Sequence, residues 1–216
     1  MSPHAPTIHF ESGLAIGYQS PLASFGKAVT LTGGTHFLLA RNGRGKTTLL
    51  RTLAGTLKPL AGNFRLTGFT QYLPEDMHFD PYLEPATLLR MLLAKPRLIE
   101  ALDLANRLEV DLKKTYGHQS TGNRRKINLI ATEFSTRPDT GNILLLDEPF
   151  SGLDAFAREV FEEIWHASTA NVLRLVSCHP DYDAMAMPSA LMIESHTARH
   201  LNGDAQTWCQ LKNLMN

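Results

Sequence analysis

The sequence predicts an α/β protein in which helices flank a mixed or parallel sheet and a compact helical insertion interrupts the chain. Short, uniformly apolar runs predict strands that are buried on both faces, as in parallel sheets. Stretches with a helical period separate those runs, and this alternation is typical of α/β folds. Over residues 81–136 the strand pattern gives way to helical patterns. We therefore expect a single domain of residues 1–216.

Four short apolar runs are the expected strands of the core. Each is bounded by turn-forming residues and is short for a helix. They are residues 36–39, 143–146, 172–176 and 190–193. Strands also dominate the chain before the first helical pattern, and we expect them to form an N-terminal antiparallel β subdomain. The expected helices of the core are residues 46–56, 155–167 and 203–215.

The helical insertion is expected to contain three helices. The stretch EPATLLRMLLAKPRLIEALDLANRL has the period of two helices, with Pro85 in a first turn and Pro96 at the break between them. The stretch GNRRKINLIATEF predicts the third. The chain would then comprise a core of residues 1–74 and 137–216 and a helical subdomain of about residues 75–136.

The composition is that of an ordinary globular protein, with 43% hydrophobic and 19% charged residues. The 21 basic residues balance 21 acidic ones, so nucleic acid is not an expected partner. The cysteines, Cys178 and Cys209, match neither a disulfide framework nor a metal-binding spacing, which favours a reducing compartment. No apolar run reaches the ~20 residues needed to cross a bilayer, and no signal-peptide pattern begins the sequence.

A phosphate-binding loop is predicted between the first core strand and the first core helix. The stretch LLARNGRGKTTLL fits the pattern G-x-x-x-x-G-K-[ST], except that Ala40 stands where the first glycine is expected. Gly43 and Gly45 would let backbone N–H groups point at phosphate oxygens. Lys46, expected to be exposed at the loop–helix junction, would supply a cation. A glycine-rich turn with an unrelated lysine is the alternative. The expected nucleotide-binding residues are Ala40, Arg41, Asn42, Gly43, Arg44, Gly45, Lys46, Thr47 and Thr48.

Two adjacent carboxylates follow another expected strand. In NILLLDEPFSGLD, Asp147 lies at the carboxyl end of the strand, where open α/β sheets bind ligands. Together with the Thr47 hydroxyl, Asp147 could hold Mg²⁺. Glu148 is placed to orient or deprotonate an attacking water. A solvated acidic turn, ended by Pro149, is the alternative.

The stretches NGRGKTTLLRTLAG, ILLLDEPFSGLD and LVSCHP together resemble the ATP-binding cassette (ABC) ATPases, and the resemblance covers nearly the whole chain. It implies a P-loop NTPase core that binds ATP with Mg²⁺ and hydrolyses the nucleotide. Tyr18 matches the family's aromatic that stacks on adenine, with an aromatic packed in the core as the alternative. His179 matches the switch histidine that contacts the γ-phosphate, so the implied catalytic residues are Lys46, Glu148 and His179.

The signature motif of the family resembles the stretch STGN, where Thr121 replaces a glycine and Asn123 replaces a glutamine. In the family this motif of one subunit closes over the nucleotide of another, so the resemblance implies a head-to-tail dimer, expected to be a homodimer. The implied ATP contacts in the motif are Ser120, Gly122 and Asn123.

A basic run, Arg124 to Lys126, follows the signature and crowds the first turn of the expected helix, where the helix dipole disfavours cations. We expect this end of the helix to face ATP phosphates on a partner subunit, with a solvated basic face or a nucleic-acid contact as alternatives. Asp154 matches the family's loop that crosses the dimer interface, and it could also cap the following helix.

One departure from the family concerns the metal. In TQYLPEDMHF, Glu75 takes the place of the usual glutamine, because Gln71 comes too early when the sequences are aligned on YLP. A carboxylate there could ligate Mg²⁺ but would also repel the γ-phosphate. The implied metal ligands are Thr47, Asp147 and Glu75.

By this resemblance the chain is expected to be the ATP-binding and ATP-hydrolysing subunit of an ABC transporter. ATP binding would close a dimer and hydrolysis would open it. Such a subunit works with a separate transmembrane permease subunit and lies peripherally on the cytoplasmic face of the membrane. The alternative is a soluble ABC ATPase of the repair, translation or iron–sulfur assembly type. The single cassette disfavours translation, and the absence of a zinc cluster disfavours repair.

Overall fold

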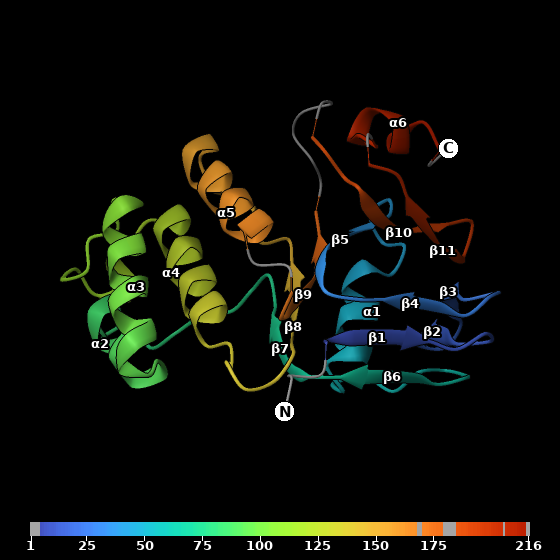
Figure 1. Ribbon diagram of the computed structural model, residues 1–216, viewed down its shortest axis with the longest axis horizontal. Helices are drawn as coiled ribbons and strands as arrows, with labels where there is room; N and C mark the ends of the chain where they lie inside the picture. The colour runs from blue at the N-terminus through green and yellow to red at the C-terminus, as the bar shows by residue number, and fades with distance from the viewer. Residues whose placement is uncertain (1–4, 168–169, 179–184, 205, 215–216) are drawn as a thin grey trace.

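The computed structural model describes residues 5–167, 170–178, 185–204 and 206–214, and its largest feature is an eight-stranded sheet. The strand order is β2-β3-β11-β10-β5-β9-β8-β7 (Figure 1). The last five strands of this order pair in parallel, as the uniformly apolar runs predict. The strands are β2 (Ala15–Gly17), β3 (Pro21–Ser24), β5 (Gly34–Leu39), β7 (Phe69–Leu73), β8 (Asn142–Asp147), β9 (Val172–Ser177), β10 (Ser189–Glu194) and β11 (Thr197–Asn202).

A second sheet confirms the expected antiparallel subdomain near the N-terminus. Three strands in the order β4-β1-β6 pair antiparallel, and β2 and β3 also form an antiparallel pair at the edge of the large sheet. In Figure 1 this second sheet lies at the end of the molecule opposite α2 and α3. Its strands are β1 (Thr7–Phe10), β4 (Val29–Leu31) and β6 (Phe64–Thr67).

The expected core strands and two of the three expected core helices are present. The strands predicted at 36–39, 143–146, 172–176 and 190–193 fall within β5, β8, β9 and β10. Helix α1 (Lys46–Leu53) is shorter than expected, because Gly55, at a φ of 76°, follows it closely. Helix α5 (Ala155–Ala167) has the bounds that were predicted.

The prediction of a helix over residues 203–215 is wrong for the first residues of this range. Helix α6 begins only at Trp208 and ends at Lys212. The residues before it form a turn, in which the Gly203 N–H donates to the carbonyl of Pro188 and the Gln206 N–H donates to that of Gly203. Strand β11 pairs antiparallel with β10 just before this turn. The spacing of apolar residues in this segment therefore predicted a helix that begins too early, because a turn after the β10–β11 hairpin precedes the helix.

Three helices and a short 3₁₀ turn lie between β7 and β8 in the chain and gather at one end of the molecule (Figure 1). Pro85 begins the first helix, as predicted. Pro96 was expected at the break between the first two helices, but it lies in the first turn of the second, which begins at Lys95. In the described residues no helix is long and apolar enough to cross a membrane. The elements are α2 (Pro85–Leu92), α3 (Lys95–Arg107), η1 (Tyr116–His118) and α4 (Thr121–Phe134).

The large sheet is buried on both faces because alternate residues of each parallel strand enter different hydrophobic clusters. In β8, Ile143 and Leu145 pack with the cluster that includes α1, whereas Leu144 and Leu146 pack with the cluster that includes α3, α4 and α5. Every residue of β8 and β9 is buried. The two clusters hold the central strands between two layers, which leaves the ends of the strands for a site.

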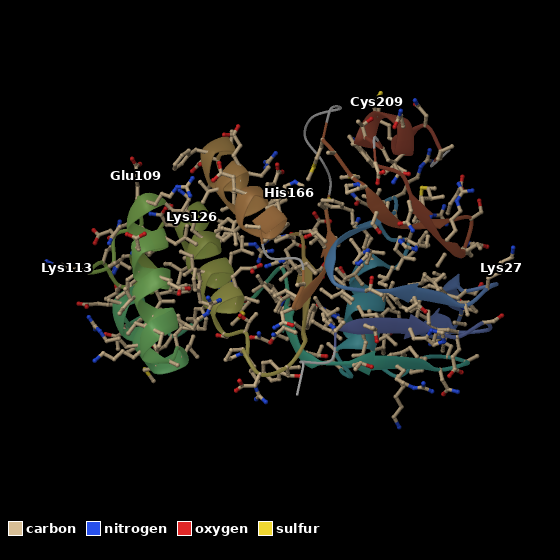
Figure 2. The ribbon with its side chains drawn as sticks, in the orientation of Figure 1. Lys27, Glu109, Lys113, Lys126, His166 and Cys209 are labelled. Carbon is tan, nitrogen blue, oxygen red and sulfur yellow. The ribbon has the colours of Figure 1, made fainter. Side chains whose placement is uncertain are left out.

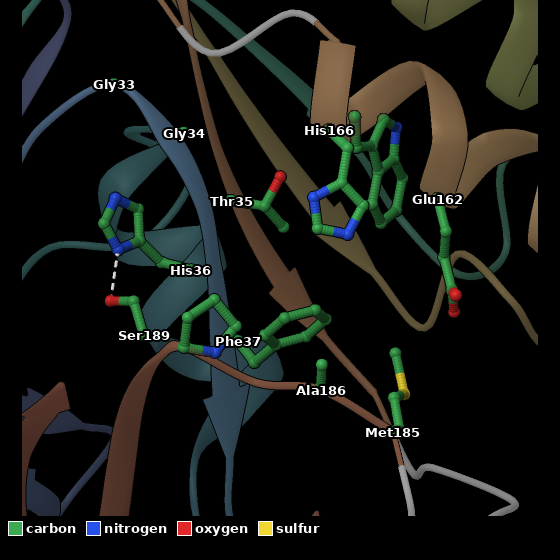
Figure 3. Close-up of a pocket in the computed structure, with 12 residues that line it drawn as sticks. Gly33, Gly34, Thr35, His36, Phe37, Glu162, His166, Met185, Ala186 and Ser189 are labelled. Carbon is green, nitrogen blue, oxygen red and sulfur yellow. Dashed lines mark hydrogen bonds between the residues drawn. The ribbon is translucent and has the colours of Figure 1, made fainter. Parts of the chain in front are cut away.

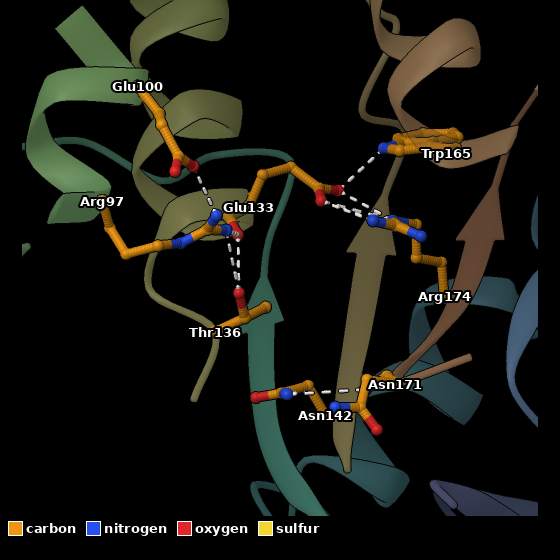
Figure 4. A network of polar contacts seen from close by, with 8 residues as sticks. All are labelled: Arg97, Glu100, Glu133, Thr136, Asn142, Trp165, Asn171 and Arg174. Carbon is orange, nitrogen blue, oxygen red and sulfur yellow. Dashed lines mark hydrogen bonds and ion pairs between the residues drawn. The ribbon is translucent and has the colours of Figure 1, made fainter. Parts of the chain in front are cut away.

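A buried ion pair joins helix α4 to strand β9 (Figure 4). The Arg174 guanidinium donates through Nη2 and Nε to both carboxylate oxygens of Glu133, at 2.8 and 3.0 Å. The Trp165 indole donates to Glu133 Oε1 at 2.7 Å. Arg174 and Glu133 are 1% and 4% exposed, so the pair is removed from water and depends on these bonds.

Glu133→Gln should lower the free energy of unfolding by about 3 kcal/mol, because it removes the carboxylate to which the buried Arg174 guanidinium donates. Urea denaturation measures this loss. Arg107→Met is the matched control, since its partner Glu163 is exposed and such pairs contribute less than about 1 kcal/mol. Equal losses for the two variants would contradict a structural role for the buried pair.

Candidate functional site

The predicted phosphate loop connects β5 to α1 and has the backbone that such a loop needs. Gly43 and Gly45 have φ angles of 73° and 101°, in the left-handed region that favours glycine. Gly45 is the N-cap of α1, and no side chain caps the helix, so its first N–H groups are available to an anion. Ala40 is buried and does not have a positive φ, so this position does not require the glycine of the sequence pattern.

The sequence led us to expect an exposed Lys46. Instead, the residue is buried and only 8% exposed. Its ammonium group donates to the carbonyl of Ala40 at 3.2 Å and lies 3.6 Å from Glu148 Oε1. The cation of the phosphate loop and the second of the paired carboxylates are therefore in contact. Thr48 is also buried, and Thr47 is half-buried in the first turn of α1.

The two carboxylates are held at the carboxyl end of β8 by the neighbouring parallel strands. Asp147 is 1% exposed and accepts hydrogen bonds from the Ser177 hydroxyl at 2.6 Å and from the Tyr72 hydroxyl at 3.4 Å. Ser177 ends β9 and Tyr72 lies in β7. The Ser177 Oγ also accepts the N–H of Glu148 at 3.0 Å. One serine therefore positions both acidic residues.

Glu148 has a left-handed backbone, with a φ of 46°. Such a conformation is uncommon for a residue with a side chain and costs of order 1–3 kcal/mol unless the surroundings impose it. Here it turns the chain sharply after the strand and brings the carboxylate toward Lys46.

Tyr18 and Tyr72 are linked through Arg51 of helix α1. Hydrogen bonds to Tyr72 and then to Tyr18 raise the pKa of Arg51. Burial raises the pKa of Tyr72, and the Asp147 carboxylate adds to that effect, so the Tyr72 hydroxyl stays a neutral donor at physiological pH. Tyr18 is 57% exposed, so it is not the aromatic packed in the core that we considered as an alternative.

The stretch resembling the signature motif begins helix α4. Ser120 is the N-cap, and its hydroxyl accepts the N–H of Asn123 at 3.1 Å. A Cβ atom on Gly122 would lie 2.8 Å from the carbonyl oxygen of Gly152, so this position requires glycine. The start of α4 and the loop before Asp154 are thus in direct contact.

Two of the three members of the basic run are buried, so the run is not the solvated basic face that was one alternative. Arg125 and Lys126 are 5% and 7% exposed. Lys126 is labelled in Figure 2. Its ammonium group lies 2.8 Å from Asp154 Oδ2 and also donates to the carbonyl of Leu108. Arg125 donates to backbone carbonyls. The cost of cations near the start of α4 is offset by these internal contacts.

Asp154 also caps helix α5, which was the second role predicted from its position in the sequence. Its Oδ1 accepts the N–H of Ala157 at 2.8 Å. The hydrogen bond from Lys126, followed by that from Ala157, lowers the pKa of the Asp154 carboxyl. The carboxylate therefore stays ionised and joins α4 to the start of α5.

One expected site residue, Glu75, stands apart from this arrangement. Glu75 is exposed and lines a hollow of about 180 Å³ with Thr121, Arg124 and Arg125. Among the described residues, no three of the His, Cys, Asp and Glu side chains gather as metal ligands, so Glu75 does not form an acidic triad with the pair at 147–148. His179 lies outside the described residues.

A second hollow, of about 300 Å³, lies at the opposite end of β5 from the phosphate loop (Figure 3). His36 and Ser189 lie along its side and are hydrogen-bonded at 2.6 Å. The Ser189 hydroxyl also lies 2.7 Å from His200 Nε2. Burial lowers the pKa of His36 and of His200. This hollow contains none of the expected nucleotide-binding residues.

Comparison with known proteins identifies the family. The family model described as "ABC transporter" matches residues 29–151, which is more than half of the chain. The chain belongs to the ABC transporter family. The matched segment includes the phosphate loop, the start of α4 and the paired carboxylates.

Curated relatives are similar over part of their length. The cytochrome c biogenesis ATP-binding export protein CcmA of Brucella abortus is 34% identical over an alignment of 152 positions, which covers 64% of this chain and 66% of the relative. The zinc import ATP-binding protein ZnuC of Photorhabdus laumondii is 32% identical over 54% of this chain and 46% of the relative. The chain therefore matches just under two thirds of the first relative and about half of the second.

Solved structures confirm the predicted fold class. An ATP-binding subunit of an ABC transporter has a TM-score of 0.73 at 20% identity, with 96% of this chain and 99% of that one covered. A bacterial Atm1-family ABC exporter with ATP bound has a TM-score of 0.79 at 14% identity, with 100% and 41% covered. At these identities the comparison supports the fold, an ABC ATPase core of the P-loop type.

Sequence reasoning missed three residues that organise the site. Ser177 could have been noticed as the polar end of an apolar strand next to the strand that carries Asp147. Tyr72 lies in a strand in which apolar and polar residues alternate only weakly, and nothing in the sequence connects Tyr72 with Asp147. Arg125 was treated as part of a basic run, although its burial distinguishes it from a solvated cation.

Cys178 should resist alkylation in the folded protein while Cys209 reacts. Burial raises the pKa of the Cys178 thiol, and the Glu148 carboxylate adds to the shift, so the reactive thiolate does not form at pH 8. Mass spectrometry after brief iodoacetamide treatment measures the labelling of each cysteine. Protein unfolded in urea is the control and should be labelled at both cysteines. Rapid labelling of Cys178 in the native protein would contradict the burial of its side chain.

Proposed function

We propose that the chain is the ATP-binding and ATP-hydrolysing subunit of an ABC transporter. The observation that carries the proposal is the contact of Lys46 with Glu148, 3.6 Å apart, between an uncapped phosphate loop and the end of β8. A cation at the phosphate loop and a carboxylate beside it are what phosphoryl transfer to water requires.

ATP would bind with its phosphates at the N-terminus of α1. The N–H groups of this turn and the Lys46 ammonium would face the phosphate oxygens, with Thr48 in the same turn. Tyr18, exposed beside Arg51, is available to stack on adenine. The proposed contacts within the loop are Ala40, Arg41, Asn42, Gly43, Arg44, Gly45, Lys46 and Thr47.

Mg²⁺ fits the chemistry of the residues beside the loop. Asp147 supplies a buried carboxyl oxygen ligand whose hydrogen-bond donors are two hydroxyl groups, and Thr47 supplies a hydroxyl. When bound, Mg²⁺ neutralises charge that develops on the phosphate oxygens. One carboxylate, one hydroxyl and substrate oxygens are an ordinary set for this ion, so a three-acid cluster is not required. Glu75 remains a proposed third ligand.

Glu148 would accept a proton from, or orient, the water that attacks the γ-phosphate. Binding of the triphosphate would draw the Lys46 ammonium toward the phosphate and so leave the Glu148 carboxylate to the water. His179 is proposed, by the family resemblance, as a further contact to the γ-phosphate.

The proposed assembly contains a second copy of this chain and a transmembrane permease subunit. Ser120, Gly122 and Asn123 would contact ATP bound by the other copy, as the family's signature motif does. Family membership and the names of relatives, an export protein and a zinc import protein, support a transport role over the soluble alternative. The chain would then lie on the cytoplasmic face of the membrane.

We also propose that residues 1–74 and 137–216 form the nucleotide-binding core and that residues of about 75–136 form a helical subdomain. The placement of α2, α3 and α4 together at one end of the molecule supports this division (Figure 1).

Lys46→Ala should weaken ATP binding roughly 100-fold, because a charge-assisted hydrogen bond contributes up to about 3 kcal/mol. A titration with a fluorescent ATP analogue measures the affinity. Lys58→Ala, which removes an exposed lysine after α1, is the matched control and should bind normally. Unchanged affinity in Lys46→Ala would exclude this loop as the nucleotide site.

Glu148→Gln should convert the chain from a monomer into a dimer when ATP and Mg²⁺ are present, because nucleotide binding is kept while activation of water is lost. Light scattering with and without nucleotide measures the change. Glu163→Gln, on the exposed face of α5, is the control and should not trap a dimer. If Glu148→Gln stayed monomeric at saturating ATP, the result would argue against a dimer that closes around nucleotide bound between its two subunits.

A further inference from the structure

Arg125 is a buried cation whose whole hydrogen-bonding capacity is directed at backbone carbonyl groups. A guanidinium has five N–H donors in a fixed plane. Nε donates to the carbonyl of Pro149 at 3.1 Å, and Nη1 donates to the carbonyls of Pro74 and Glu75 at 3.3 and 3.2 Å. Nη2 donates to the carbonyls of Asp147 and Glu148.

The five acceptors lie in two segments at the same edge of the sheet, where β7 and β8 end and the loops after them begin. Strands β7 and β8 are parallel neighbours, with Leu73 opposite Leu146, so the segments that follow them begin side by side. One segment contains Glu75, and the other contains both carboxylates of the site. Arg125 lies between the two segments and comes from a third element, helix α4. One side chain thus joins three parts of the molecule.

The contacts of Arg125 act most directly on Glu148. The peptide groups on both sides of this residue are held, the N–H by Ser177 and the carbonyl by Arg125. Its left-handed backbone persists only while such contacts impose it. If the carbonyl were released, the chain could relax to an ordinary conformation and carry the carboxylate away from Lys46.

Among the described residues, no carboxylate lies at ion-pair distance from Arg125, so its charge is satisfied by carbonyl dipoles. Burial lowers the pKa of Arg125, while the carboxylates of Glu75, Asp147 and Glu148 oppose that effect, and the guanidinium stays protonated. Neither lysine, with three donors on one nitrogen, nor glutamine, with two, can reach both loops in this way.

We propose that Arg125 is a positioning residue for ATP hydrolysis. It holds the Glu148 carboxylate in the position required for hydrolysis and couples that position to the conformation of the loop that contains Glu75. The inference rests on the proposed function of Glu148. A displacement of the 74–75 loop would be transmitted through the guanidinium to the carbonyls of 147–149, and the carboxylate of Glu148 would move with them. The nucleotide-binding loop makes none of these five contacts, so ATP affinity is separate from this effect.

The test compares ATP affinity and kcat for Arg125→Gln, Arg125→Lys and Glu133→Gln, at a temperature at which melting curves show each variant folded. Glu133→Gln is the matched control, because it removes a buried charge from the same helix far from both loops. For Arg125→Gln we expect kcat about 100-fold lower, the size of effect that a small misplacement of a catalytic group produces, with ATP affinity within about threefold of wild type. For Arg125→Lys we expect an intermediate loss, and for Glu133→Gln a kcat within about twofold.

The double variant Arg125→Gln/Glu148→Gln shows whether Arg125 acts through Glu148. If it does, the double variant hydrolyses ATP no more slowly than Glu148→Gln alone, because the group that Arg125 positions is already gone. Losses that multiply would overturn the inference, as would equal losses of kcat in Arg125→Gln and Glu133→Gln.

Amide hydrogen exchange gives a readout that does not depend on activity. Arg125→Gln should increase exchange in residues 75–77 and 148–151 together, whereas Glu133→Gln should leave both segments unchanged. Unaltered exchange in either segment of Arg125→Gln would overturn the inference. If the wild type failed to hydrolyse ATP, the proposed function would be wrong, and exchange alone would still decide whether Arg125 couples the loops.

Discussion

The parallel register of β7, β8 and β9 is the constraint on which the site depends. Because the three strands run in the same direction, their carboxyl ends meet at one edge, and Tyr72, Asp147 and Ser177 come within hydrogen-bonding distance. The strand that leads into the phosphate loop, β5, is paired with β9 in the same sense. A slip of one residue in β8 would send Asp147 to the other face of the sheet and separate it from both hydroxyl groups.

The residues predicted from the sequence were those whose chemistry follows a local pattern. The phosphate loop was recognised because glycine, lysine and threonine must follow one another along the chain, and Asp147 because it ends an apolar run. The contacts that orient these residues are not local. Ser177 lies 30 residues from Asp147 and Tyr72 lies 75 residues away, so their roles depend on strand order, which spacing does not reveal.

The errors have physical causes of the same kind. A basic run at the start of a helix is normally solvated, and only tertiary contacts show that Arg125 and Lys126 are buried among carbonyls and a carboxylate. Lys46 was expected at the surface because loop–helix junctions usually lie there, but the carbonyl of Ala40 and the carboxylate of Glu148 enclose its ammonium group. In the C-terminal part, Gly203 and the hairpin of β10 and β11 prevent an early helix.

The contact between Lys46 and Glu148 has a consequence for the resting protein. The Lys46 ammonium group and the Glu148 carboxylate lie 3.6 Å apart and attract each other. An anion that binds at the phosphate loop would have to compete with the Glu148 carboxylate for the Lys46 ammonium group. On the proposed function, this contact would set a minimum negative charge for binding and so would favour a triphosphate over weaker anions.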